Sequence, residues 1–412
     1  MTQSKSSTPV SPRGAVEVQE FYERYPYPPP SDDLDRYRER WQDPKRRRAD
    51  FHLFWPDKSY HEDYSILVAG CGTSQTAKYA VRWPGAEVTG IDFSATSVRH
   101  TVRLKDKYRL DNLEVHQLAL QDAADLDRSF DQIVCTGVLH HLVDPGAGLS
   151  ALRNVLKPDG VMHLMVYAPY GRSGVYMLQE FCRRIGVPAT DGGIHDLIVA
   201  LTSLPAGHPL ERLLRESPDL RSDTALADAL LHPHDRAYSV PAFFDLLDAG
   251  RLTFGRWVRQ APYSICCGVM ARISATLPMA GLNPRDQYAA AELFRGTMLR
   301  HSAVVYRDDS PRAPSITFGG DEWLKYVPIR AADTIAVQER LPPGSVAVLI
   351  NRTHTFPDIY LPITPSQRRL LESLDGRSTI GELLPSAVPR DEARAYFERL
   401  WWHDQIVFDA AH

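Results

Sequence analysis

Hydrophobic and polar positions alternate most regularly between residues 65 and 168, where short runs of Ile, Val and Leu are separated by longer amphipathic stretches. Such runs predict strands, and the stretches between them, such as 94–108 and 146–156, predict helices. The predicted strands are 66–69, 87–91, 113–115, 132–135 and 161–166. This alternation is typical of a parallel sheet with helices on both faces.

The segment before the sheet divides into two parts. Residues 1–14 are polar and predict a disordered tail. Residues 15–60 predict an N-terminal arm or lid, in which a helical pattern from Val16 stops at the prolines that begin with Pro26. The run from Lys45 to Arg48 is interpreted as a solvated helix face.

After the regular region the alternation breaks. Residues 61–310 are predicted to form the main domain, with a largely helical insertion at about 171–250 on the substrate side. Two late strands, 251–258 and 302–307, are expected to join the same sheet. The Pro- and Asp-containing stretch 308–314 predicts a linker.

The last segment, 315–412, predicts a separate accessory domain. Strand-like runs at 346–350 and 406–408 flank a helix-turn-helix pattern, which indicates a small α+β unit of winged-helix type. The unit is loosely similar to the small peptide-binding domains that accompany enzymes modifying ribosomal peptides. A structural or dimerising module remains an equal alternative.

Composition narrows the class of protein. The chain has 412 residues, 43% hydrophobic and 24% charged, which fits two to three globular domains and excludes a wholly disordered chain. A net charge of −4 gives no large cationic field for nucleic acid. Five cysteines without a Cys-x-x-Cys pair favour neither a disulfide framework nor a zinc ribbon. Without a long apolar run or a hydrophobic signal region, the expectation is a soluble, cytoplasmic protein.

The first predicted strand runs into Gly70-Cys71-Gly72 and then a helix. Glycines there let a ligand approach the backbone, and helix N–H groups point at it. Asp92 ends the next strand, twenty residues beyond Gly72, where a carboxylate can accept both hydroxyls of a ribose. Gln75 occupies the position of the third glycine in a dinucleotide fingerprint, which argues against a dinucleotide.

Two further segments, Phe130 to Leu142 (FDQIVCTGVLHHL) and Leu156 to Gly160 (LKPDG), complete a set of motifs over about 65–168. This set resembles the class I S-adenosylmethionine-dependent methyltransferases. The resemblance implies an α/β, Rossmann-like methyltransferase sheet with the helical insertion and the small C-terminal domain added. It implies S-adenosyl-L-methionine as cofactor, with S-adenosyl-L-homocysteine as product. The expected reaction is methyl transfer to an O or N atom of a small-molecule or peptide acceptor.

The resemblance also implies roles for individual residues around the cofactor. Gly70, Cys71 and Gly72 in the turn would wrap the methionine part. Asp92 and Phe93 at the end of the second strand would hold the ribose and adenine, and Gln121 and Asp122 after the third strand would reach the adenine edge. Cys135 and Thr136 at the end of the fourth strand would face the sulfonium.

The chain departs from the family at two positions. Val68 stands where the family has an acid that fixes the methionine amino group, and Ser74 stands where a glycine is common. Gln75 or a tyrosine of the arm could substitute for that acid. We therefore expect Tyr22 and Tyr27 to bind the cofactor as part of a lid, the alternative being an arm that only docks.

Residues at the same sheet edge are candidates on the acceptor side. His140 could act as general base, although the His140-His141 pair could also be structural. Tyr170 and Arg172 follow the fifth strand, and Arg172 could pair with a carboxylate or phosphate of the acceptor. His232-Pro-His234-Asp235 lacks a third partner at ligand spacing, so no metal is expected.

Two other functions stay open. An RNA or protein methyltransferase could dock its substrate on Lys45 to Arg48 and the C-terminal unit, although nucleic acid is disfavoured. A non-catalytic cofactor-binding scaffold is favoured by Val68. The expected partner is a small-molecule or peptide acceptor, without a membrane, and a homodimer is compatible with the sequence.

Overall fold

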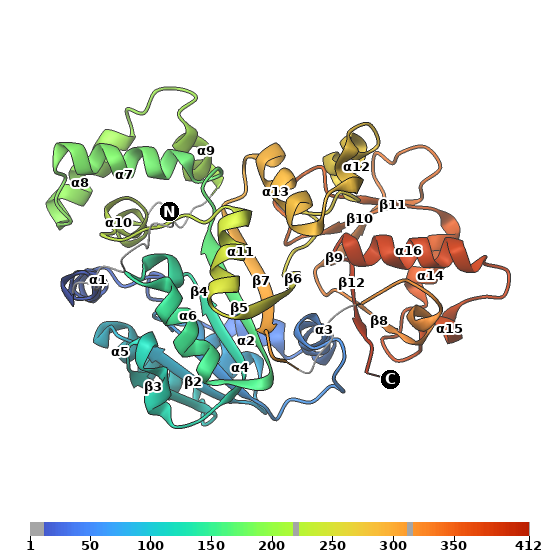
Figure 1. The fold of residues 1–412 in the computed structure, drawn as a ribbon, viewed down its shortest axis with the longest axis horizontal. Coiled ribbons are helices and arrows are strands. Elements are labelled where there is room, and N and C mark those ends of the chain that lie inside the picture. Colours follow the sequence, from blue (N-terminus) through green and yellow to red (C-terminus); the bar gives the residue numbers. More distant parts are fainter. Residues whose placement is uncertain (1–11, 217–221, 311–315, 412) are drawn as a thin grey trace, which may run out of the picture.

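The computed structural model describes residues 12–216, 222–310 and 316–411. Within these ranges a seven-stranded sheet in the order β3-β2-β1-β4-β5-β7-β6 forms the centre (Figure 1). Its strands are β1 (Ser65–Ala69), β2 (Glu87–Asp92), β3 (Leu113–Gln117), β4 (Phe130–Thr136), β5 (Leu156–Tyr167), β6 (Leu252–Trp257) and β7 (Arg300–Arg307).

The sheet confirms the predicted strands, including the two late ones. β3, β2, β1, β4 and β5 are parallel, and β7 runs antiparallel to both β5 and β6. β5 begins earlier than predicted, because Leu156 already pairs with Phe130. Helix α6 (Pro145–Asn154) therefore ends two residues before the predicted boundary.

Alternate residues of β1 enter different halves of the core, as expected for a strand buried on both faces. Leu67 packs in a cluster with residues of α6 and α11 (Val240–Ala249). Ile66 and Val68 pack in a second cluster with residues of α3 (Pro44–Phe54), α4 (Gln75–Arg82) and α5 (Ala95–Tyr108). This burial explains why β1 reads as a continuous apolar run.

The arm before the sheet holds α1 (Pro12–Arg24), α2 (Asp35–Trp41) and α3. The predicted tail 1–14 falls mostly outside the described residues, but α1 begins at Pro12 rather than at Val16. α1 lies between α5 and the helical insertion, which contains α7 (Ser173–Ile185), α8 (Asp191–Leu201), α9 (Pro209–Glu216) and α10 (Asp223–Leu231) (Figure 1). Helices α12 (Gly268–Ser274) and α13 (Pro284–Arg295) join β6 to β7.

The C-terminal segment is an α+β unit of two small antiparallel sheets, in the orders β11-β10-β9 and β12-β8, and three helices. The strands predicted at 346–350 and 406–408 correspond to β10 and β12. The elements are β8 (Val327–Arg330), β9 (Thr334–Val337), β10 (Ala347–Asn351), β11 (Leu361–Ile363), α14 (Pro365–Glu372), α15 (Ile380–Leu383), α16 (Arg390–Trp402) and β12 (Ile406–Asp409).

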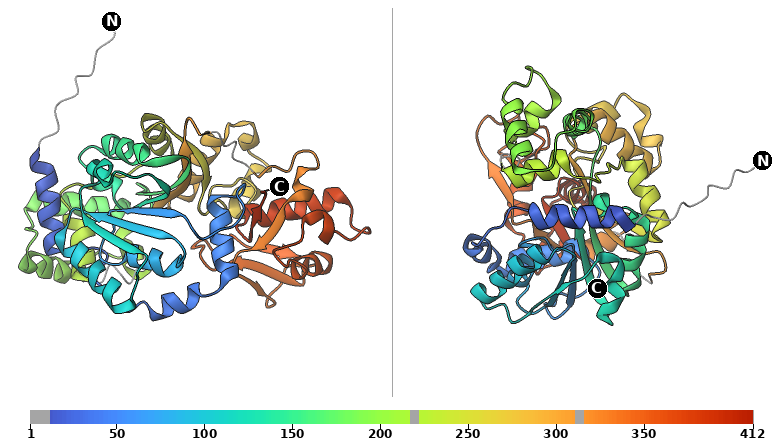
Figure 2. Two further views of the ribbon diagram at one scale, coloured as in Figure 1. Left: turned by 90° about the horizontal axis from the view of Figure 1, so that it is seen from below. Right: turned by 90° about the vertical axis from the view of Figure 1, so that its left-hand side faces the viewer.

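This unit is packed firmly against the arm, with α3 beside β12 (Figure 2). Ile329 and Val407 share a hydrophobic cluster with Phe54. Arg46 and Arg48 of α3 pair with Asp333 (3.0 Å) and Asp409 (2.8 Å) of the unit.

The interpretation of the basic run as a solvated face was therefore wrong for most of it. Arg47 also has a carboxylate partner, Glu62 at 2.7 Å in the segment before β1, whereas Arg46 and Arg48 hold the arm and the C-terminal unit together. Only the start of the predicted linker is described. Asp308 there pairs with Arg153 and Arg251, while 311–314 lie outside the described residues.

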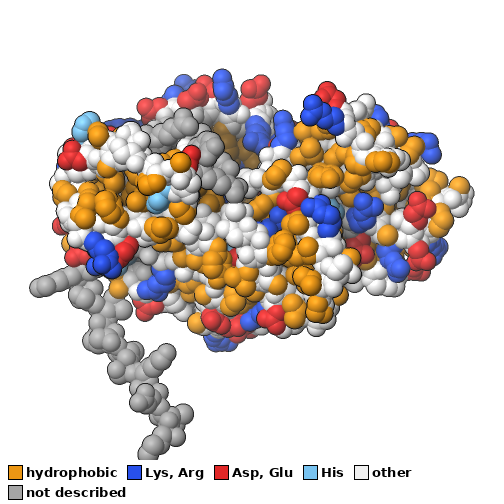
Figure 3. Space-filling view, turned by 90° about the horizontal axis from the view of Figure 1, so that it is seen from above, with side chains coloured by type: hydrophobic (Ala, Val, Ile, Leu, Met, Phe, Trp, Pro, Cys, Tyr) orange, Lys and Arg blue, Asp and Glu red, His pale blue; other side chains and the backbone are white. Residues whose placement is uncertain are grey.

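Charged side chains of both signs are scattered over the face drawn in Figure 3, between groups of hydrophobic side chains. No helix among the described residues is long and apolar enough to cross a membrane.

Candidate functional site

A cavity of about 1330 Å³ lies at the carboxyl edge of the sheet. Its walls come from the ends of the parallel strands, from the arm, from the helical insertion and from residues 353–356 of the C-terminal unit. Ligands of open α/β sheets bind at this edge. The volume exceeds the roughly 300–1,000 Å³ of a pocket for one small molecule, which leaves room for a cofactor together with an acceptor.

The turn after β1 requires its glycines. Gly70 and Gly72 have φ of +74° and +52°, in the left-handed region. A Cβ on Gly70 would lie 2.3 Å from Val138, and one on Gly72 would lie 2.8 Å from the Tyr27 carbonyl oxygen. Both glycines line the cavity, so the backbone itself forms this part of the wall.

Asp92 lies at the end of β2 with its side chain buried beside the turn. Its two carboxylate oxygens accept hydrogen bonds from the backbone N–H groups of Gly72 (2.8 Å) and Ser94 (2.9 Å). Burial raises the pKa of this carboxyl to about 6. Asp92 lines the cavity, and each oxygen has a second lone pair with which it can accept a ribose hydroxyl. These free acceptor positions fit the ribose of a nucleoside cofactor.

The residues expected around adenine divide in two. Phe93 and Gln121 line the cavity, as do Leu118 and Leu120. Asp122 is exposed and lies outside the lining residues, so its expected contact with the adenine edge is not supported.

Two cysteines are likewise placed away from the cavity. Cys71 and Cys135 are fully buried in the two core clusters, and burial raises the pKa of both thiols, that of Cys135 to about 12. Side chains of consecutive strand residues point to opposite faces, and here the neighbouring Thr136 faces the cavity while Cys135 faces the core. Any contact that Cys71 makes with a ligand must come from its backbone.

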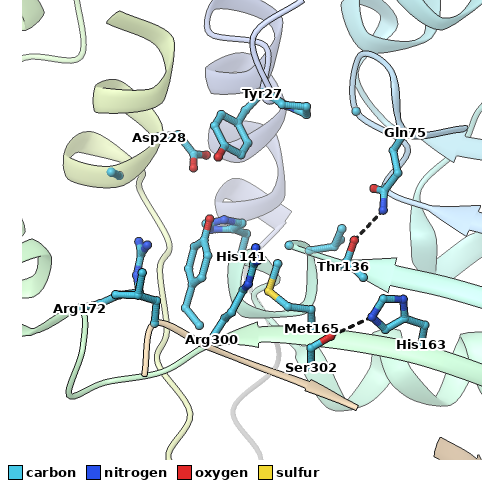
Figure 4. Close-up of a pocket in the computed structure, with 18 of the residues that line it drawn as sticks. Tyr27, Gln75, Thr136, His141, His163, Met165, Arg172, Asp228, Arg300 and Ser302 are labelled. Atoms are coloured by element: carbon cyan, nitrogen blue, oxygen red, sulfur yellow. Dashed lines mark hydrogen bonds between the residues drawn. The ribbon is translucent and has the colours of Figure 1, made fainter. Parts of the chain in front are cut away.

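Gln75 faces the cavity from the start of α4, where its amide donates to the Thr136 hydroxyl at 2.6 Å (Figure 4). Val68 is fully buried in the core, so no carboxylate takes the place of the family's acid at this strand position. A third glycine at position 75 would let α4 pack closely on the sheet. Here Gly90 of β2 allows this close packing instead. A Cβ there would lie 2.5 Å from the Thr76 hydroxyl oxygen.

The arm covers the cavity and is attached on both sides of it. The Glu23 carboxylate accepts from the Thr96 backbone N–H at the start of α5 (3.2 Å), and the Gln19 amide donates to the Phe93 carbonyl (3.0 Å). On the other side the Tyr22 hydroxyl donates to Asp228 of α10 at 2.9 Å. Thr73 fastens the arm to the turn by donating to the Pro28 carbonyl at 2.8 Å.

The expected lid tyrosines both line the cavity. Tyr22 is placed edge-on to Phe93, with ring centroids 6.2 Å apart. Figure 4 shows Tyr27 and Asp228 pointing toward one another across the cavity. Asp228 was not found from the sequence, because nothing in the local pattern of α10 distinguishes it from a surface carboxylate.

Asp228 belongs to a cluster with His141 and His232, whose ligand atoms lie within 4.8 Å of one another. His232 therefore has two neighbours with ligand atoms, His141 and Asp228, that the spacing along the sequence did not indicate. The His234 backbone N–H donates to Nδ1 of His232 at 3.0 Å, so a neutral ring carries its proton on Nε2. A histidine that binds a metal through Nε2 instead donates from Nδ1, so this hydrogen bond opposes a metal site.

The structure places His141, and not the expected His140, at the cavity. His140 is buried, lies outside the lining residues and has no hydrogen-bond partner on either nitrogen. Burial holds its pKa well below the usual range. His141 lines the cavity, and its Nδ1 donates to the His234 carbonyl at 2.9 Å, which leaves the lone pair on Nε2. His141 is the histidine placed to accept a proton.

Tyr170 and Arg172 both line the cavity, as expected. Tyr170 is exposed, whereas Arg172 is buried with its guanidinium 3.6 Å from the centre of the Tyr167 ring. Arg172 also lies 3.6 Å from an Asp235 carboxylate oxygen. Its charge therefore already has a protein partner, which weakens the expectation that it binds an anionic acceptor.

The region that carries the cofactor motifs is similar to known proteins. A family described as "Methyltransferase domain" matches residues 67–162. An uncharacterised protein of Synechococcus sp. is 34% identical over 249 residues, 58% of this chain and 58% of the relative. A ubiquinone biosynthesis O-methyltransferase of Alkalilimnicola ehrlichii is 30% identical over 136 residues, 31% of this chain and 54% of that protein.

Another relative is the malonyl-[acyl-carrier protein] O-methyltransferase of Acetivibrio thermocellus, 28% identical over 120 residues, 29% of this chain and 41% of the relative. The chain thus spans about half the length of the curated relatives it matches. Among solved structures, PKMT2 from Rickettsia typhi has a TM-score of 0.62 at 15% identity. That match covers 90% of this chain and 75% of PKMT2, and it shows a shared fold.

Three observations point to the same kind of domain. They are the strand order of the sheet, the position of the glycine turn and Asp92 at one cavity, and the family match over the same residues. They support a methyltransferase domain of the class I, S-adenosylmethionine-dependent type over residues 67–162.

Proposed function

We propose that this protein transfers a methyl group from S-adenosylmethionine to an oxygen or nitrogen atom of a small-molecule or peptide acceptor. The observation that carries the proposal is the continuity of one cavity from Gly70, Gly72 and Asp92 to His141. A cofactor cradle and a candidate base thereby share one space that the arm and the insertion cover.

Different residues would bind the cofactor and accept the proton. Asp92 holds the ribose hydroxyls, Phe93 lies against the adenine, and the turn encloses the methionine part. Bound there, S-adenosylmethionine supplies an activated methyl group on its sulfonium. His141 accepts the acceptor's proton on Nε2, while its Nδ1–H stays on the His234 carbonyl and fixes the ring. The arm excludes water from this space.

An oxygen atom of a small molecule is the favoured acceptor. Two of the relatives over the methyltransferase domain are named as O-methyltransferases, one of ubiquinone biosynthesis and one of malonyl-[acyl-carrier protein]. A hydroxyl acceptor also loses a proton when it is methylated, which makes a base such as His141 useful for this class of acceptor.

Calorimetry with S-adenosylhomocysteine tests the cofactor assignment. Asp92→Ala removes a charge-assisted hydrogen bond of about 1.5–3 kcal/mol and should weaken affinity roughly tenfold to more than a hundredfold. Asp125→Ala, an exposed carboxylate outside the lining residues, is the control and should bind like the parent chain. Equal affinity of Asp92→Ala and the parent would contradict the assignment. An acceptor screen with isotope-labelled cofactor, read by mass spectrometry, then identifies the product.

The two rival functions make different predictions in the same assays. An RNA methyltransferase needs a free basic face, but Arg46, Arg47 and Arg48 are engaged with carboxylates of this chain. We therefore expect no mobility shift with RNA. A scaffold without activity would bind no S-adenosylhomocysteine at millimolar concentration, or would bind it and methylate nothing in the screen.

A further inference from the structure

One part of the cavity lies between β5, β7 and the C-terminal unit. Arg259, Arg300, His163 and Ser302 line it, together with residues 353–356 of the C-terminal unit. Figure 4 shows Arg300 pointing into the cavity on the side of Met165 and His141. This part is more basic than the cavity as a whole, whose other wall holds Asp92 and Asp228.

The two arginines differ from the other arginines of this region in their partners. Arg82, Arg172 and Arg256 each have a carboxylate within 3.6 Å, namely Asp50, Asp235 and Asp404. Neither Arg259 nor Arg300 forms an ion pair with any residue that the structure describes. Arg259 is oriented by neutral groups, since its guanidinium donates to the Thr353 hydroxyl and to the Val258 carbonyl. Both charges therefore lack a compensating carboxylate in direct contact.

The nearby arginine charges also act on His163. Its Nε2 lies 2.8 Å from the Ser302 hydroxyl oxygen, and its Nδ1 is buried without a hydrogen-bond partner. Burial, and after it the charges of Arg82, Arg259 and Arg300, together lower the pKa of His163 to about 3. The ring is thus neutral, and three guanidinium groups act on one side of the cavity.

We propose that Arg259 and Arg300 form an anion subsite that binds a carboxylate or phosphate group of the methyl acceptor. The guanidinium group matches both anions through paired N–H donors. This inference rests on the proposed function and narrows its substrate class to acceptors that carry such a group apart from the methylated atom.

The subsite also gives the C-terminal unit a place in acceptor binding. Thr353 follows β10 of that unit and holds Arg259, which follows β6 of the main domain. The unit thus completes a wall of the acceptor pocket, and the methyltransferase domain alone lacks this wall.

Titration calorimetry with benzoate and inorganic phosphate tests the subsite, and neutral benzamide is the control probe. We expect the parent chain, with and without saturating S-adenosylhomocysteine, to bind at least one of the two anions more tightly than benzamide, with affinity that falls as salt is added. Arg300→Gln and Arg259→Gln should each weaken binding about tenfold or more, and Arg300→Lys should retain part of it. Arg285→Gln changes an exposed arginine outside the cavity and should have no effect.

Three results would overturn the inference: no anion binding, equal binding of benzoate and benzamide, or anion binding that both glutamine variants leave unchanged. A parallel loss of S-adenosylhomocysteine affinity in Arg300→Gln would also overturn it, because the arginine would then serve the cofactor's own carboxylate. Unchanged thermal midpoints establish that the variants are folded. If the parent chain binds anions but no S-adenosylhomocysteine, the proposed function fails, and Arg259 and Arg300 form an anion site that does not serve a methyl acceptor.

Discussion

The Tyr22 hydroxyl donates to the Asp228 carboxylate at 2.9 Å, although the two residues are 206 positions apart. Burial raises the pKa of both groups. The pair joins the arm to the helical insertion over the cavity, and both residues line that cavity. Together with the hydrogen bond from the Tyr25 hydroxyl to Asp191 of α8, it connects the two parts of the chain that enclose the site.

Removing this hydrogen bond should loosen the cover. Tyr22→Phe leaves a buried carboxylate without its donor, at a cost of about 1.5–3 kcal/mol, so we expect S-adenosylhomocysteine to dissociate faster and bind roughly tenfold more weakly. Tyr25→Phe is the matched control, because Tyr25 donates at the same distance to Asp191, whose side chain is 85% exposed. Equal affinities for the two variants would make the arm a docking segment only.

Cofactor affinity should depend on pH through Asp92. With its pKa raised to about 6 by burial, the carboxyl becomes protonated as the pH falls below 6 and loses an acceptor for the ribose hydroxyls. We expect affinity for S-adenosylhomocysteine to fall from pH 7.5 to pH 5 in the parent chain and to stay flat in Asp92→Asn. A parent affinity that is constant over this range would contradict the role of Asp92.

The same shift predicts an opposite effect on stability. A carboxyl whose pKa is raised on folding, here from 3.8 to about 6, makes the free energy of unfolding decrease as the pH rises between these values. The loss reaches up to about 3 kcal/mol at neutral pH, at 1.36 kcal/mol per unit. Thermal unfolding should therefore show the stability of the parent relative to Asp92→Asn decreasing by up to this amount from pH 4 to pH 7.5.

His141 should affect the chemical step and leave cofactor binding unchanged. In His141→Asn the side-chain amide can still donate to the His234 carbonyl, but the basic nitrogen is gone. We expect kcat with the identified acceptor to fall by about 10²–10⁴-fold, with unchanged affinity for S-adenosylhomocysteine. Added imidazole should restore part of the rate. A small effect on kcat would mean that the acceptor loses its proton without a base.

The cluster of His141, Asp228 and His232 should work without a metal. Because the His234 N–H holds Nδ1 of His232 as an acceptor, metal binding through Nε2 would break that hydrogen bond. We expect a chelator to leave turnover and cofactor affinity unchanged, and elemental analysis to find no stoichiometric metal. A loss of turnover that zinc or another divalent ion reverses would contradict this assignment.

Ending the chain at Ser310 tests whether the C-terminal unit is an independent domain. The truncation removes Ile329 and Val407 from a cluster that contains Phe54, at about 1.5–3 kcal/mol for each side chain. It also deprives the buried Arg256 of Asp404. We expect a fragment with a clearly lower thermal midpoint that still binds S-adenosylhomocysteine at low temperature. An unchanged midpoint would establish two independently folding domains.

The sequence by itself determined the central sheet, the glycine turn and the position of Asp92. These features follow from local pattern: a strand buried on both faces must be continuously apolar, and the tight turn after it requires glycine at positive φ. The partners of the site could not be found in this way. Asp228 and Arg259 lie in segments without a motif, and the arginines of α3 resemble any solvated basic run. His140 and His141 share one pattern, and only packing places one in the core and the other in the cavity. Pairing of charges, hydrogen bonding of buried groups and closure of the cavity all depend on contacts between distant segments, and the tertiary structure alone decides those contacts.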